Sequence, residues 1–112
     1  MAKKESPKLK SEEVTPVLEP FELLISDRYE LTSPISTHVY RYADGSVLIT
    51  SMELNLYAEG DTEYEARRNF SDILVEQVED LESFVEQGRR LGRDLELQLA
   101  LLRRLLRRLE DK

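Results

Sequence analysis

The chain has 112 residues, of which 40% are hydrophobic and 35% charged, a size and balance that suit one small polar domain with a modest core. It contains no cysteine and one histidine, which excludes disulfides, thiolate metal sites and multi-histidine metal sites. No apolar run reaches the roughly 20 residues of a membrane span, and the first residues lack the apolar segment of a signal peptide. We therefore expect a cytoplasmic protein without membrane contacts.

Charge is distributed unevenly along the chain. Residues 1–88 contain 8 Lys and Arg against 19 Asp and Glu, a net charge of −11, whereas residues 89–112 contain 8 against 4, a net charge of +4. The acidic part repels nucleic acid and favours a basic protein partner. An equally good interpretation of the acidity is solubility alone.

The first third of the chain predicts a tail and short extended segments. Residues 1–14 are charged and poor in apolar side chains, which predicts disorder, and the domain is expected to span residues 15–88. Pro16 and Pro20 frame a connector, which is followed by two short extended segments at residues 21–25 and 28–31.

A hairpin is predicted next. Residues 37–42 and 47–52 are predicted as two strands that flank Asp44-Gly45, a pair typical of two-residue turns. A two-residue loop at this position places Tyr42 opposite Val47 and Tyr40 opposite Ile49, with both pairs on one face of the sheet.

A third strand and a long helix follow the hairpin. The strand is predicted over residues 54–59 and the helix over residues 62–87, with Thr62 as its N-cap and Glu65 completing a capping box. Gly60 is expected to supply a backbone conformation that other residues resist. The helix has one apolar face, formed by Ala66, Phe70, Ile73, Leu74, Gln77, Val78, Leu81, Phe84 and Val85. Together these elements predict an α+β fold, a three- to four-stranded antiparallel sheet covered by one long helix.

The order of strand, Asp-Gly turn, strand and Gly60-Asp61-Thr62, followed by Glu65, Ala66 and Asn69, resembles the HicB-like antitoxin family over residues 35–86. The resemblance implies a partial ribonuclease H-like fold without catalytic acids. It also implies a partner, a small RNA-cleaving toxin of the HicA type that the antitoxin occludes. Many family members carry a DNA-binding appendage, whereas this chain continues into a Leu/Arg helix.

No catalytic residue and no cofactor are predicted. His38 lies on a candidate strand, where a packing or surface role is the default. The best candidates for contacting a partner are the polar residues around the third strand, which are Glu53, Asn55, Tyr57 and Glu59.

A second amphipathic helix is predicted over residues 91–109, within a C-terminal segment of residues 89–112. At 100° per residue its leucine stripe falls within an arc of roughly 80°; the stripe comprises Leu91, Leu95, Leu99, Leu102, Leu106 and Leu109. Three roles remain open for the stripe: packing within the fold, self-association, or docking on a partner.

Arginines occupy the rest of this helix, among them Arg103, Arg104, Arg107 and Arg108. A basic face of this kind either contacts phosphates weakly or is solvated and pairs with acidic neighbours; the wide arc and the lack of interleaved aromatic residues favour the second role. The leading functional hypothesis is a non-catalytic antitoxin of a type II toxin–antitoxin system that binds a basic toxin. The alternatives are a self-associating interaction module, which forms homo-oligomers, and a weak nucleic-acid binder.

Overall fold

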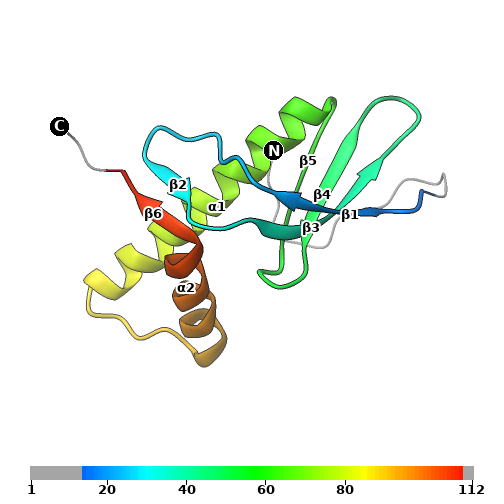
Figure 1. The fold of residues 1–112 in the computed structure, drawn as a ribbon. Coiled ribbons are helices and arrows are strands. Elements are labelled where there is room, and N and C mark those ends of the chain that lie inside the picture. The colour runs from blue at the N-terminus through cyan, green and yellow to red at the C-terminus, as the bar shows by residue number, and fades with distance from the viewer. Residues whose placement is uncertain (1–13, 110–112) are drawn as a thin grey trace.

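The computed structural model describes residues 14–109, which form an α+β fold as the sequence predicted. Four strands form an antiparallel sheet in the order β1-β3-β4-β5, and two further strands, β2 and β6, pair with each other (Figure 1). In chain order the elements are β1 (Val17–Phe21), β2 (Tyr29–Leu31), β3 (Ile35–Arg41), β4 (Val47–Ser51), β5 (Leu56–Gly60), α1 (Glu63–Glu86), α2 (Arg93–Leu105) and β6 (Leu106–Arg108). The tail predicted for residues 1–14 lies outside the described residues, apart from Val14.

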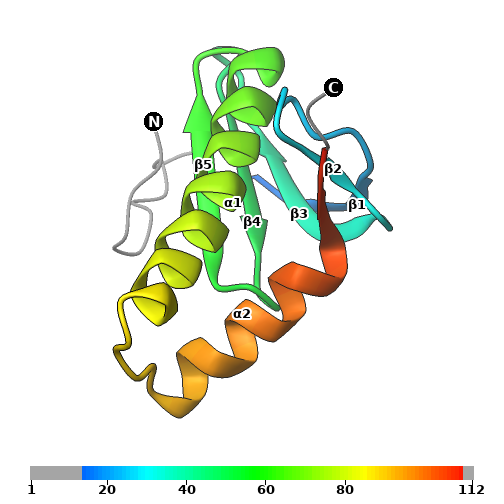
Figure 2. The same cartoon turned by 90° about the vertical axis from the view of Figure 1, so that its left-hand side faces the viewer.

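The core lies between the sheet and α1, which crosses one sheet face (Figure 2). Ala66, Phe70 and Leu74 on α1 have no exposed surface, as the 3.6-residue period of the helix predicted. The ring of Phe70 meets that of Phe21 edge to face, with 5.0 Å between their centroids. The core is thus formed by the apolar face of α1 packed against the strand residues that point towards it.

The first strand lies earlier in the chain than predicted. β1 contains Pro20 and ends at Phe21, where the predicted extended segment of residues 21–25 was expected to begin. Proline is tolerated because β1 is an edge strand that pairs only with β3, so an amide on its outer side is dispensable.

The hairpin forms, but the predicted register is wrong. Its loop has three residues, because the Tyr42 amide donates to the Ser46 carbonyl at 3.0 Å and Gly45 adopts a φ of 93°. Tyr40 therefore lies opposite Leu48, and Val39 lies opposite Ile49. A shift of one residue places Tyr40 and Tyr42 on the sheet face opposite to Val47 and Ile49, which belong to the core beneath α1.

The junction of β5 and α1 corrects two further expectations. Thr62 Oγ1 caps the helix by accepting from the Glu65 amide at 3.1 Å, but Glu65 Oε1 accepts from the amide of Asp61, at 2.7 Å, rather than from that of Thr62. Gly60 is needed for space and not for a left-handed φ: a Cβ there would lie 2.4 Å from the backbone nitrogen of Ala66. The first turn of α1 rests directly on this glycine.

The second helix is shorter than predicted. α2 ends at Leu105, and Leu106–Arg108 extends as β6, pairing antiparallel with β2. The backbone groups at the junction have partners outside the helix, since the Thr32 amide donates to the Leu105 carbonyl at 2.8 Å. Strand pairing therefore replaces the last helical turn, although the leucine spacing continues through it.

Most of the leucine stripe packs within the fold. Leu99, Leu102 and Leu106 belong to the same core as the sheet and α1, and Leu91 is half-buried against it. The remaining two positions of the stripe are more exposed, 41% for Leu95 and 38% for Leu109.

Candidate functional site

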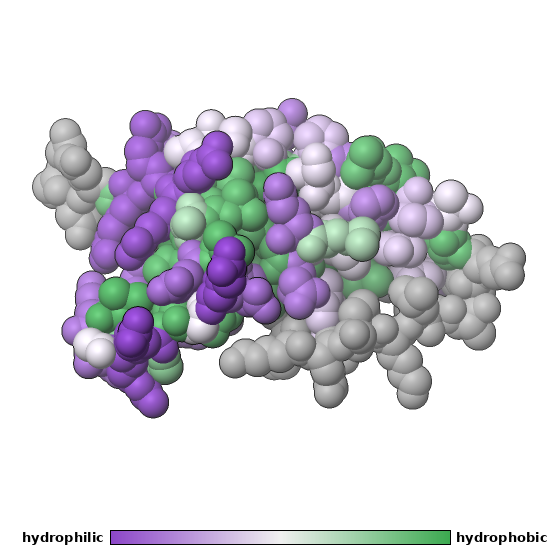
Figure 3. All heavy atoms as spheres, turned by 90° about the horizontal axis from the view of Figure 1, so that it is seen from below, coloured by the Kyte–Doolittle hydropathy of each residue, from purple (hydrophilic) through white to green (hydrophobic). Residues whose placement is uncertain are grey.

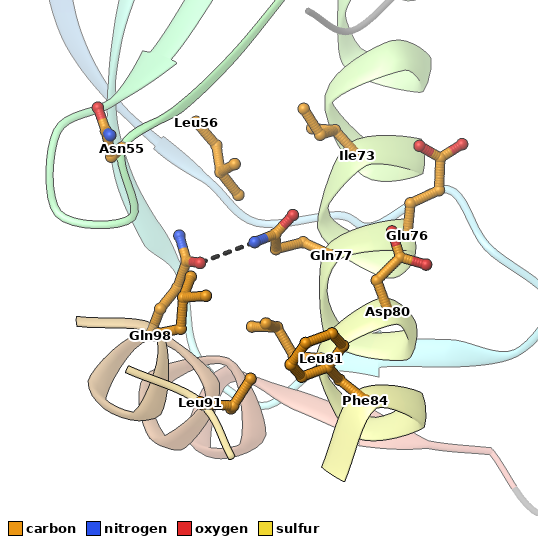
Figure 4. A pocket seen from close by; sticks show the side chains of 11 residues that line it. Asn55, Leu56, Ile73, Glu76, Gln77, Asp80, Leu81, Phe84, Leu91 and Gln98 are labelled. Atoms are coloured by element: carbon orange, nitrogen blue, oxygen red, sulfur yellow. Dashed lines mark hydrogen bonds between the residues drawn. The ribbon is translucent and has the colours of Figure 1, made fainter. Parts of the chain in front are cut away.

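A groove lies between the C-terminal half of α1, the start of α2 and the turn that joins β4 to β5 (Figure 4). Its volume is about 470 Å³, within the usual range of ligand-binding clefts. Apolar side chains from all three segments line it: Leu56, Ile73, Leu81, Phe84, Leu91 and Leu95. In the space-filling view from below, hydrophobic atoms surrounded by hydrophilic ones are exposed over this end of the molecule (Figure 3).

The groove exists because α1 stops abruptly and α2 runs back towards the sheet. Gly88 follows the helix with a φ of 80°, the left-handed conformation that commonly terminates helices. The Arg89 amide donates to the Phe84 carbonyl at 3.3 Å, and its guanidinium carbon lies 4.4 Å from the centre of the Phe84 ring. These two contacts hold the start of the connection against the last turn of α1.

Two glutamines bridge the groove. Gln98 Nε2 on α2 donates to the Leu54 carbonyl at 2.6 Å, so Gln98 Oε1 is left to accept from Gln77 Nε2 on α1, at 2.8 Å. These two hydrogen bonds fix the orientation of both side-chain amides. Gln77 Oε1 is directed away from the bridge (Figure 4). Gln98 interrupts the leucine pattern of α2; that interruption is the sequence signal for a polar contact here.

One side of the groove is acidic. From Asp72 to Glu86, α1 carries six Asp and Glu residues and no Lys or Arg. Two of the six are paired, Glu79 with Arg28 at 2.6 Å and Glu82 with Arg103 at 3.1 Å. The two that line the groove are Glu76 and Asp80, both exposed, and neither has an ion-pair partner among residues 14–109.

Glu76 and Asp80 lie one helical turn apart, so their charges repel each other on the same side of α1 (Figure 4). Like-charge pairs at this spacing destabilise a helix slightly, and a cation placed between them removes that repulsion. Nothing in the sequence distinguishes these two residues, because acids are common throughout the chain. Only the position of α2 shows that this pair borders a groove.

The four predicted partner-binding residues do not form one surface. Glu53 and Asn55 lie in the exposed turn before β5, and Asn55 lines the groove. Tyr57 and Glu59 point from the other face of the sheet, where Tyr57 is 7% exposed and packs with Tyr42 and Leu48. The alternation that the sequence suggested is broken at Asn55, which has a φ of 56°.

The residues of the family-like motif gather at the junction of β5 and α1, where their contacts are with the chain's own backbone. Asn69 Nδ2 donates to the Glu59 carbonyl at 2.8 Å, which ties the second turn of α1 to the strand. Ala66 packs with no exposed surface beside Gly60. Thr62 and Glu65 cap the helix start around Asp61.

Two of the four arginines at the end of the C-terminal segment form ion pairs within residues 14–109. Arg103 pairs with Glu82, and Arg107 pairs with Glu30, which lies directly opposite it on β2. Arg104 and Arg108 are exposed. Half of the candidate phosphate-binding face is therefore engaged with the acidic body.

A further charged cluster lies at the N-terminal end of α1. Arg41 donates to Glu19 at 2.6 Å and to Glu63 at 3.0 Å, and Arg67 donates to Glu63 at 2.8 Å. Hydrogen bonds from these two arginines lower the pKa of Glu63 from 4.5 to about 2. Both acids already have partners, so this cluster holds β1, β3 and α1 together.

Comparison with protein-family models, curated proteins and solved structures returns no match to this chain. Within residues 14–109, no helix has the length and apolarity needed to cross a bilayer. In the same residues no three metal-ligating side chains come together. Because it combines an apolar lining with two exposed carboxylates, the groove between α1 and α2 is the strongest candidate site on the described part of the chain.

Proposed function

We propose that the chain is a non-catalytic HicB-like antitoxin that binds and neutralises a small, basic, mRNA-cleaving toxin. The observation that carries the proposal is the groove between α1 and α2, which combines apolar walls with two carboxylates, Glu76 and Asp80, that have no ion-pair partner within residues 14–109. Apolar surface supplies the free energy of association, and the carboxylates select a basic partner.

Two other observations support the proposal. The motif around Gly60 and Thr62 resembles the family and forms a tight strand-to-helix junction. Residues 1–88 carry a net charge of −11, which attracts a basic protein and raises its association rate. Neutralisation needs no chemistry from the antitoxin, because occluding the toxin's active site is sufficient.

Co-expression tests the proposal. The chain is expressed together with the product of the small open reading frame beside its gene, and growth and co-purification are measured. We expect the neighbouring protein to arrest growth alone, and the chain to restore growth and co-purify with it. A toxic neighbour that neither binds the chain nor is neutralised by it contradicts the proposal.

Self-association through α2 is the second candidate function. Leu97 is 62% exposed on the outer side of α2, on the same side as Arg93 and Arg104. Sedimentation equilibrium of the full chain and of Leu97→Glu distinguishes the cases: a dimer that this variant dissolves supports self-association, and a monomer in both removes it. A truncation after Gln87 is unsuitable, because it removes core residues of α2.

A further inference from the structure

We infer that the groove between α1 and α2 receives an amphipathic helix of a partner protein, and that a lysine or arginine of this helix lies between Glu76 and Asp80. The inference rests on the proposed role as a protein-binding antitoxin and specifies the partner's chemistry. It is carried by the geometry of the groove, by two acidic side chains on its border that have no ion-pair partner in the described part of the chain, and by the position of the chain's own basic residues.

The walls of the groove favour a helical occupant. Its long sides are α1 and α2, whose interior backbone groups are already hydrogen-bonded within each helix. Of the edge strand β5, only its first residue, Leu56, lines the groove, so an extended peptide would find little strand edge to pair with, whereas a helix satisfies its own backbone. On α1 the lining positions Ile73, Gln77, Leu81 and Phe84 recur at helical spacing over about 16 Å, so they form a stripe that suits the side chains of a third helix.

The border of the groove favours a basic residue on that helix. Glu76 and Asp80 are exposed and without an ion-pair partner among residues 14–109, and they repel each other. Gln77, between them in sequence, uses its amide nitrogen in the bridge to Gln98, so its oxygen remains to accept a hydrogen bond. The two carboxylates, one helical turn apart on the border of the groove, match an ammonium or guanidinium group, which carries only donors.

A second copy of the chain fits the groove less well. Its α2 offers a leucine flanked by arginines, Leu97 with Arg93 and Arg104, but this surface lies on the far side of the helix from the groove. Leu97 is roughly 160° around the helix axis from Leu95, which lines the groove. In a dimer with two-fold symmetry, the Leu97 surface of each copy therefore cannot occupy the groove of the other copy. This surface could enter a groove only in a head-to-tail arrangement of successive copies. The partner is thus a different protein.

A synthetic probe tests the inference without knowledge of the natural partner. The probe is a labelled amphipathic peptide of about 18 residues, five helical turns, made of leucine, lysine and alanine. Its affinity for the full chain is measured by fluorescence anisotropy, and its site is mapped by amide chemical shifts. We expect shifts at Ile73, Leu81 and Leu95, and weaker binding as the salt concentration rises.

Paired variants separate the groove from general attraction. Glu76→Gln with Asp80→Asn removes the two charges on the border, and we expect about tenfold weaker binding. The matched control is Glu22→Gln with Asp27→Asn. It also removes one Glu and one Asp charge, but from the exposed β1–β2 connection, and we expect it to change the affinity for the probe less than twofold.

A second pair tests the apolar wall with residues of one helix. Leu95→Ala removes a partly exposed leucine that lines the groove, and we expect about tenfold weaker binding. Leu97→Ala removes an exposed leucine on the outer side of α2, and we expect no change. Both positions are exposed enough to keep the fold intact in either variant.

Three results overturn the inference: no binding of the probe, equal losses in the groove and control variants, or a dimer of the chain alone that Glu76→Gln with Asp80→Asn dissolves. The co-expression experiment distinguishes failure of this inference from failure of the antitoxin proposal. A toxin complex that is insensitive to the groove variants removes only the inference. Probe binding in the groove without any toxin complex removes only the proposed function.

Discussion

The position of the C-terminal helix is tested by truncating one of its leucines. Leu102 has no exposed surface and packs in the core formed by the sheet and α1. Leu102→Ala removes buried methyl groups and leaves a cavity that the surrounding core fills only in part, so we expect the free energy of unfolding to fall by about 3–5 kcal/mol. This is a large part of the 5–15 kcal/mol typical of a whole domain.

Leu97→Ala is the matched control on the same helix. Leu97 is 62% exposed and alanine is a strong helix former, so we expect a change within about 0.5 kcal/mol. Both variants are unfolded in urea and followed by circular dichroism, and their midpoints are compared at unchanged slope. If Leu102→Ala lowers stability no more than Leu97→Ala, α2 lies outside the cooperative core and the packing described here is wrong.

Three further predictions concern the remaining parts of the fold. Gly60→Ala should lower the free energy of unfolding by about 1–3 kcal/mol in the same urea assay, because its Cβ meets the Ala66 nitrogen at 2.4 Å; a change below 0.5 kcal/mol contradicts this. Glu63→Gln should lower stability by about 1 kcal/mol at pH 7, a small value because the carboxylate is 40% exposed and screened by solvent. The pKa of Glu63 is lowered from 4.5 to about 2, so this difference should be full above pH 4.5 and vanish as the pH falls to about 2; a difference that persists at pH 2 refutes the ionic origin. Tyr29→Phe should raise the thermal midpoint and increase the free energy of unfolding by about 1 kcal/mol, because the buried Tyr29 hydroxyl has no hydrogen-bond partner in the described part of the chain. A loss of stability would show that the hydroxyl has a partner.

The hairpin shows where sequence reasoning reached its limit. Asp44-Gly45 correctly located the turn, because the preference of that pair for tight turns depends only on its own backbone. It did not determine the loop length, since two- and three-residue loops both accept glycine in a left-handed conformation. The difference of one residue separates Tyr40 and Tyr42 from Val47 and Ile49, and the two tyrosines pack instead with Leu48 and Tyr57 on the other sheet face.

The candidate site was beyond sequence reasoning for a similar reason. Asn55 was named as a partner-binding residue and does line the groove, but Glu76 and Asp80 gave no signal among 23 acids. A groove is a relation between elements that are distant in sequence. Its walls appear only when α2 has folded back on α1 and the β4–β5 turn.

The sequence by itself determined the α+β composition, the cap at Thr62 and the buried face of α1, because each depends on neighbours within one or two turns of the chain. Tertiary structure determined whether the end of the leucine-rich segment is helix or strand. Leu106–Arg108 has the spacing of a helix, yet it is a strand, because the backbone of Tyr29–Leu31 offers it a partner. Helical periodicity describes which side chains share a face, whereas the choice between helix and strand also depends on hydrogen-bonding groups brought in from elsewhere in the chain.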